Sequence, residues 1–166
     1  CSSDLVDCFA GSLHPGTLHG QQVGVASLTM ARIQQGLLAQ EKPPVMKPTQ
    51  IDFEGMKQRM GGTAAQCLEQ LERKAMDQQA VNSANERLAA IWPDLKREVQ
   101  AFMIPVAEME KLLVDAGAPT TAAELGLDLD FYRQAVRYGH EMRDRFSFVD
   151  IAANADVLEP FVAAQT

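Results

Sequence analysis

The chain has 166 residues, of which 46% are hydrophobic and only 6% aromatic, and its net charge is −7. This length suits one domain with a core of its own. An acidic chain without a cluster of Lys and Arg argues against a nucleic-acid partner. No apolar run is long enough to span a bilayer and no signal-peptide pattern is present, so we expect no membrane association.

The three cysteines indicate the redox environment. Cys1, Cys8 and Cys67 cannot all pair with one another, and their spacing is not that of a disulfide framework. We therefore expect a reducing, cytoplasmic compartment. The first residue is not an initiator Met, and residues 3–9 already have the pattern of a helix. These features predict that the chain is a piece of a longer polypeptide.

Apolar residues recur with helical spacing along most of the chain, whereas the strict alternation typical of strands is nearly absent. The first clear helical face steps by three and four residues through Val23, Ala26, Met30, Ile33 and Leu37. Gly24 lies inside this helix. A glycine there costs about 1 kcal/mol relative to alanine, which suggests a packing or ligand reason for it.

The segment 41–50 carries three prolines and is predicted to be a loop. A short helix over 52–60 follows and is closed by a pair of glycines. Thr63 is expected to cap the next helix, which would run to about Met76.

Prolines divide the middle of the chain. A helix over 84–91 is expected to break at Pro93, which fits the first turn of a following helix over 94–102. Pro105 would start another helix, ended by Gly117. The residues expected on one face of that helix are Val106, Met109, Leu112 and Leu113.

The last part of the chain continues this pattern. Thr120 or Thr121 with Glu124 predicts a capping box for a short turn, and helices are expected over 130–142 and 148–153. The fold class predicted is all-α, a multi-helix bundle in a single domain that spans all 166 residues.

The three histidines differ in their surroundings. His14 precedes a Pro-Gly turn, which indicates an exposed loop residue. His140 lies near a helix end, where it would meet the dipole or form a surface pair. His19 lies at a helix start, where the positive end of the dipole favours the neutral imidazole that binds metal.

Two further residues are candidate metal ligands. Asp4 and Cys8 are four residues apart on an expected helix and so share a face. A carboxylate, a thiolate and the imidazole of His19 together would hold Zn²⁺. In the structural alternative, Asp4 complements the helix dipole and Cys8 is a small buried residue.

A charged triplet precedes the last predicted helix. Arg143, Asp144 and Arg145 are interpreted as a solvated ion-pair cluster, and an anion clamp or a subunit contact is the alternative. The sequence contains no nucleophile elbow, no C-x-x-C pair and no glycine-rich nucleotide-binding motif.

Several stretches together resemble one family. LHGQQVGVASL (18–28) resembles the histidine-glycine helix of the dehydroquinate synthase-like and iron-containing alcohol dehydrogenase superfamily. AGAPTTAAELGLD (116–128) and RDRFSFVDIAA (143–153) resemble its glycerol-1-phosphate dehydrogenase branch, and WPDL (92–95) fits the same frame. The resemblance covers nearly the whole chain.

The resemblance implies the C-terminal helical domain of a two-domain enzyme whose absent N-terminal α/β domain binds NAD(P). A divalent metal (zinc, iron or nickel) would lie in the cleft between the domains. His19 matches the metal-binding histidine of the His-Gly motif. Asp4 stands where the family has a ligand histidine, and Cys8 where it has the second histidine of the same helix.

The chemistry implied is hydride transfer from the nicotinamide to dihydroxyacetone phosphate, a small phosphorylated substrate, with the metal as Lewis acid. A homo-oligomer is expected, and the isolated chain is expected to be inactive. Because Asp4 replaces a histidine, the alternative is a non-catalytic helical binding or assembly module that has lost its metal. A dehydroquinate synthase-like lyase ranks last, because it does not need the AGAPTT stretch (116–121).

Overall fold

The computed structural model describes residues 18–165, and every regular element in that range is helical. The all-α prediction is therefore confirmed for this part of the chain, whereas the helix expected over 3–9 lies outside the described residues. The elements are α2 (His19–Leu38), α3 (Phe53–Met60), η1 (Gly61–Thr63), α4 (Ala64–Glu72), α5 (Gln78–Phe102), α6 (Val106–Asp115), α7 (Leu129–Tyr138), η2 (Gly139–Met142), α8 (Phe148–Asn154) and α9 (Leu158–Ala163).

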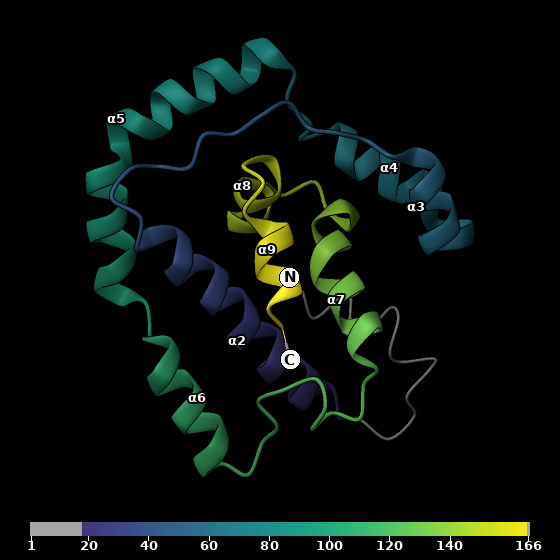
Figure 1. The fold of residues 1–166 in the computed structure, drawn as a ribbon, viewed down its shortest axis with the longest axis vertical. Helices are drawn as coiled ribbons and strands as arrows, with labels where there is room; N and C mark the ends of the chain where they lie inside the picture. The colour runs from purple at the N-terminus through teal and green to yellow at the C-terminus, as the bar shows by residue number, and fades with distance from the viewer. Residues whose placement is uncertain (1–17, 166) are drawn as a thin grey trace.

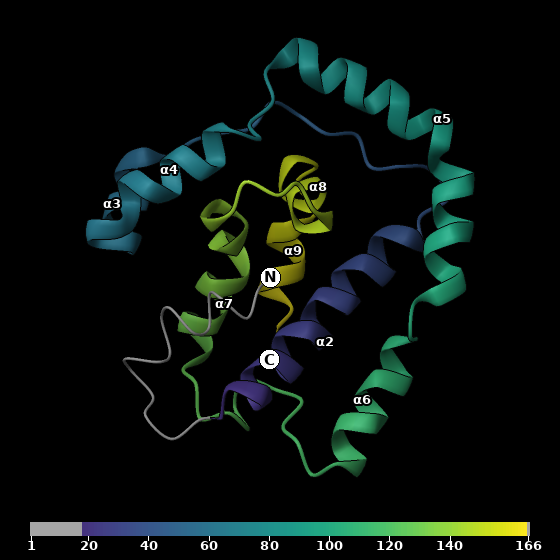
Figure 2. The ribbon, with the colours of Figure 1, turned by 180° about the vertical axis from the view of Figure 1, so that it is seen from behind.

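Helix α2 runs diagonally through the middle of the molecule (Figure 1). It packs against α6 on one side and against α8 on the other, while α7 and α8 both contact α9. Helices α3 and α4 form an arm that joins the rest through η2, as the reverse view also shows (Figure 2). Among the described helices, none is both long and apolar enough to span a membrane.

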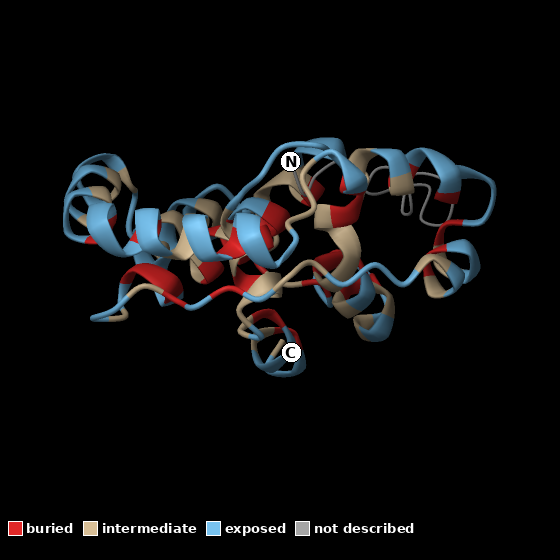
Figure 3. Ribbon diagram, turned by 90° about the horizontal axis from the view of Figure 1, so that it is seen from above, coloured by how far each residue is buried: buried red, intermediate tan, exposed pale blue. Residues whose placement is uncertain are grey.

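Buried apolar side chains form three groups. Figure 3 marks the buried residues along the ribbon in red. The largest group joins α2 to α7, α8 and α9 and includes Leu37, and the second joins the end of α2 to α5 and includes Leu38. The third lies within α3 and α4 and includes Met56 and Cys67. Two neighbouring leucines thus connect two different cores.

The glycine inside α2 has a packing role. A Cβ atom added to Gly24 would lie 3.2 Å from Cδ2 of Leu113, which belongs to α6. Because real Cβ contacts are rarely this short, Gly24 is the residue that lets α6 approach α2. This contact supplies the packing reason that the sequence suggested for a glycine at this position.

The predicted helix break at Pro93 is wrong. Helix α5 is continuous from Gln78 to Phe102. Its N-cap is Asp77, whose side chain accepts a 2.8 Å hydrogen bond from the backbone N–H of Ala80. Figure 1 shows that α5 bends rather than ends, as expected when proline removes one helical hydrogen bond.

Tertiary contacts hold α5 together across this proline. Trp92, the preceding residue, is buried with Leu38 and Met46 in the second core. Asn85 donates to the carbonyl oxygen of Met46 and accepts from its N–H, both at 2.9 Å. The loop over 41–50 is thereby fastened along the helix, which offsets the lost hydrogen bond.

Two other helix ends differ from the prediction. Thr63 occupies the N-cap position of α4, as expected, but its side chain does not cap the helix, because its hydroxyl donates to the carbonyl oxygen of Met60 at 2.8 Å. Helix α4 ends at Glu72, and α7 ends at Tyr138 and gives way to the tighter turn of η2. Leu112 was expected on the packed face of α6 but is 55% exposed.

Other local predictions are confirmed. Pro105 caps the start of α6, and Gly117 ends it with a φ of 67°, in the left-handed region that glycine adopts without strain. The capping box is also present. The N–H of Glu124 donates to the Thr121 hydroxyl at 3.2 Å, and the Glu124 carboxylate accepts from the N–H of Thr120 at 2.7 Å.

The contact between α2 and α6 can be tested by replacing two glycines of α2 with leucine, each in its own variant. Gly24→Leu should destabilise the fold by about 1–3 kcal/mol, because the new side chain has no room beside Leu113. Gly36→Leu is the matched control. A Cβ atom at Gly36 meets nothing within 4 Å, so leucine should be neutral or stabilising there. Urea unfolding of both variants measures the difference, and equal effects would contradict this packing.

Candidate functional site

His19 is the first residue of α2 and is exposed. The carbonyl oxygen of the preceding Leu18 accepts the N–H groups of Gln21 and Gln22 at 2.9 and 3.2 Å. The first turn contains no acidic residue, so no side chain of that turn neutralises the positive end of the helix dipole. The imidazole is therefore placed where the sequence predicted it, at the positive end of a long helix.

The described residues do not by themselves make a metal site. Within residues 18–165 there is no group of three or more His, Cys, Asp or Glu side chains able to hold a metal ion. Asp4, Cys8 and His14 lie outside the described residues, so the structure does not test whether they approach His19.

Gln22 is a polar residue that the sequence did not single out. It is only 3% exposed, and among the described residues its Oε1 atom has no hydrogen-bond partner. A buried acceptor left without a donor destabilises a fold by about 1–3 kcal/mol. Two turns further along the same buried face, Thr29 satisfies its hydroxyl with the Tyr132 hydroxyl at 2.5 Å. The buried face of α2 therefore has one hydroxyl with a partner and one amide oxygen without a partner among the described residues.

A second polar region lies where α4, η2 and α8 meet. The ammonium group of Lys74 donates to the carboxylate of Asp150 and to the carbonyl oxygen of His140, both at 2.5 Å. Both charged side chains are only 5% exposed. The other oxygen of Asp150 accepts the N–H and the hydroxyl of Ser147 at 2.7 and 2.8 Å. A buried ion pair therefore fastens the α3–α4 arm to α8.

A second buried pair flanks the first. Arg59 of α3 lies 3.2 Å from the carboxylate of Glu141 in η2, and its guanidinium covers the ring of Tyr138 at 3.6 Å from the ring centroid. Burial raises the pKa of Glu141 above its ordinary value, and the charge of Arg59 acts in the opposite direction. We call Lys74, Asp150, His140, Arg59 and Glu141 the η2 polar cluster.

His140 lies near a helix end, as the sequence predicted, but it is half-buried in η2 rather than part of a surface pair. Its Nδ1 atom is buried and has no hydrogen-bond partner within residues 18–165. Burial lowers the pKa of His140, and the nearby Lys74 charge adds to this, whereas Asp150 opposes it. Sequence spacing did not reveal the burial, because η2 is covered by α4, more than sixty residues earlier in the chain.

The charged triplet 143–145 before α8 is exposed, as predicted, but its acidic residue pairs with an arginine outside the triplet. Asp144 lies 3.7 Å from Arg73 at the end of α4. The buried acid of this stretch is Asp150, six residues later. One signal in the sequence could have found it, because Ser147 and Asp150 have the spacing of a capping box.

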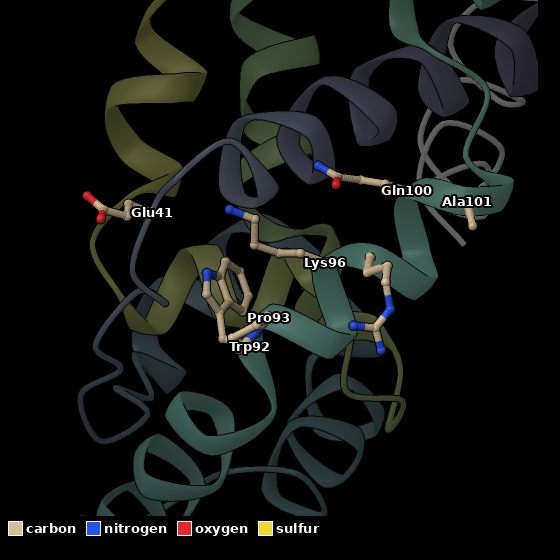
Figure 4. Close-up of a pocket in the computed structure, with 7 residues that line it drawn as sticks. Glu41, Trp92, Pro93, Lys96, Gln100 and Ala101 are labelled. Carbon is tan, nitrogen blue, oxygen red and sulfur yellow. The ribbon is translucent and has the colours of Figure 1, made fainter.

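Figure 4 shows an open hollow at the bend of α5, of about 580 Å³, with Trp92, Lys96 and Glu41 among its lining residues. Lys96 donates to the carbonyl oxygen of Gln40 at 2.8 Å, and the indole N–H of Trp92 points to the same oxygen at 3.4 Å. Its polar groups therefore serve mainly to tie α5 to the chain that follows α2.

The comparisons with known proteins give one partial similarity. Over 42 residues the chain is 43% identical to the glycerol-1-phosphate dehydrogenase [NAD(P)+] of Haloquadratum walsbyi. The match covers 25% of this chain and 12% of that protein. No family model and no solved structure matches. The similarity agrees with the family that the motifs suggested, although over a short stretch.

The buried ion pair of the η2 polar cluster gives a stability prediction. Asp150→Ala should destabilise the fold by about 3–5 kcal/mol, because it leaves the ammonium of Lys74 buried without its carboxylate. The matched control is Asp94→Ala in α5, whose partner Arg97 is exposed and for which a loss below about 1 kcal/mol is expected. Chemical denaturation compares the two, and losses of similar size would contradict the role of the buried pair.

The lowered pKa of His140 gives a pH prediction. The unfolded histidine takes up a proton at about pH 6.5, whereas the folded one is protonated only at a lower pH. The stability that the neutral His140 contributes is therefore complete above about pH 6.5. It is lost as the pH falls toward the folded pKa. In His140→Phe the free energy of unfolding should therefore fall less between pH 7.5 and 5.5. Other groups titrate in both proteins and cancel in the comparison. Identical pH profiles would show that His140 does not titrate differently on folding.

Proposed function

We propose that this chain is the helical, metal-binding domain of an NAD(P)-dependent oxidoreductase similar to glycerol-1-phosphate dehydrogenase. The observation that carries the proposal is the 43% identity over 42 residues to an enzyme of that name. The all-helical architecture and the place of His19 at the start of α2 support it. The order of the three motifs along the chain supports it too.

In this proposal His19 is one metal ligand, and Asp4 and Cys8 are the candidates for the others. A bound zinc, iron or nickel ion would supply Lewis-acid polarisation of the carbonyl group of dihydroxyacetone phosphate. The contribution of α2 is positional, since His19 is its first residue and is exposed. The sequence has no glycine-rich phosphate-binding loop, so NAD(P) would bind to an α/β domain not contained in this chain.

A second function is favoured by one residue. Asp4 stands where the family has a ligand histidine, and an aspartate there suits a helical module that has lost its metal and serves in binding or assembly. The two functions differ in metal content, and so metal analysis separates them.

The test combines metal content with activity. After incubation with Zn²⁺ and desalting, the wild-type chain should retain about one equivalent of metal, as measured by mass spectrometry. His19→Ala should lose it, because one imidazole ligand is removed. His14→Ala is the control, since His14 is predicted to be an exposed loop residue. In a polypeptide that also carries the nucleotide-binding domain, His19→Ala should lower NAD(P)H oxidation by dihydroxyacetone phosphate by roughly 100-fold or more.

Two results would contradict the dehydrogenase proposal. One is a wild-type chain that retains no metal, which would favour the binding or assembly module. The other is a His19→Ala variant with full metal content and full activity.

A further inference from the structure

The α3–α4 arm is attached to the rest of the described chain at its base and along η2. At the base, the N–H of Thr49 donates to the carbonyl oxygen of Met76 at 2.9 Å, and the Thr49 hydroxyl accepts the Met76 N–H at 3.0 Å. Asn154 of α8 donates to the same hydroxyl at 3.3 Å. The second attachment is the contact of α4 with η2. The arm can therefore leave η2 while its base stays joined to α8.

The arm also has apolar packing of its own. The fully buried residues of its core come from α3 and α4 with the turn between them, while Tyr138 and Met142, of α7 and η2, pack against this core from outside. Helices α3 and α4 lie beside each other at the edge of the molecule (Figure 1). Release from η2 therefore leaves most of this packing inside the arm.

The η2 polar cluster lies at the second attachment, and its charges balance while His140 is neutral. Lys74 pairs with Asp150, and both are buried. Arg59 pairs with Glu141. A proton on His140 adds a third cation to a cluster with two carboxylates.

Neither carboxylate has an oxygen to spare for that cation. One oxygen of Asp150 accepts from Lys74, and the other accepts the N–H and the hydroxyl of Ser147. Both oxygens of Glu141 lie within 3.4 Å of the Nη2 atom of Arg59. A charged imidazole therefore has to displace an existing partner or leave the cluster.

Other charged side chains near η2 form ion pairs in which the acid is exposed. These pairs are Asp52 with Arg59, Glu69 and Asp144 with Arg73, and Glu159 with Arg137. Arg143 and Arg145 are also exposed. Because water screens exposed charges, these groups offset little of a positive charge placed inside the cluster.

The neutral form of His140 is favoured in the cluster. Burial lowers the pKa of His140; Asp150 and the backbone of Arg137 oppose this, whereas Lys74 adds to it. Since the imidazole recovers its ordinary pKa in water, acid favours a state in which it is solvated. Burial raises the pKa of Glu141, so its titration acts in the opposite direction and favours the attached arm.

We propose that protonation of His140 releases the α3–α4 arm from η2, so that the arm is a pH-sensitive element of the fold. The step is the uptake of one proton by the imidazole. In the released state water solvates the new charge, and the hydrogen bonds between Thr49 and Met76 keep the base in place. Release exposes Tyr138 and Met142, which the arm covers when it is attached.

Hydrogen exchange measured by mass spectrometry tests this release in the full chain. Short helices such as α3 and α4 are marginal without tertiary packing, so release should reduce the protection of their amides. Between pH 7.5 and 5.5, after correction for the intrinsic exchange rate, protection over residues 53–72 should fall by up to about tenfold. This limit follows from an ordinary histidine pKa of about 6.5. Peptides from α2 should keep their protection.

Variants at two histidines assign the effect. In His140→Asn and in His140→Phe, protection of the arm should fall less than in the wild-type chain, because neither side chain takes up a proton. Glu141 and the other carboxylates titrate in all of these proteins and cancel in the comparison. His19→Asn is the matched control, since His19 is exposed at the start of α2, and it should behave as the wild type does.

A pH series of the wild-type chain gives a readout that needs no variant. The loss of protection in the arm should begin near about pH 6.5. A loss that begins only below about pH 5 would belong to carboxylates and would overturn the proposal. Equal losses in α2 and in the arm, a wild-type arm that keeps its protection, or an unchanged loss in both His140 variants would overturn it too.

Discussion

The fold depends on the burial of α2 from two sides. Leu37 belongs to the core shared with α7, α8 and α9, and the next residue, Leu38, belongs to the core shared with α5. A helix that is packed on both sides can neither rotate nor slide without exposing one of these cores. Gly24 adds a third constraint, because only a residue without a side chain admits Leu113 at that distance. The orientation of the first turn, with His19 and Gln22, is fixed by these contacts.

The η2 polar cluster has a different physical character. Moving Lys74 and Asp150 out of water is unfavourable, and their attraction recovers this free energy only because further hydrogen bonds satisfy both groups. Such a pair contributes to geometry more than to net stability. Part of the RDRFSFVDIAA stretch that resembles the dehydrogenase family is thereby explained without a ligand, since Ser147 and Asp150 cap α8 and anchor the α3–α4 arm.

The sequence predicted the features that depend on neighbouring residues. The start of α6 at Pro105, its end at Gly117 and the capping box at Glu124 follow from local backbone chemistry. The errors have a tertiary cause. Helix α5 continues through Pro93 because contacts from the loop over 41–50 hold it, and no local rule contains those contacts. Lys74 and Asp150 are 76 positions apart, so neither residue alone indicates a buried pair.

His19 and Gln22, both near the start of α2, differ in how much the sequence alone reveals about their surroundings. His19 could be found from the sequence, because its meaning comes from a helix start a few residues long. Gln22 could not, because its burial and its missing partner exist only in the folded chain. Within the same motif, Gly24 is accounted for by its contact with Leu113, whereas packing does not account for Gln22. An apolar residue would fill that position without an unsatisfied oxygen. The sequence alone thus shows which helix starts here, whereas only the fold shows which of its polar side chains are buried.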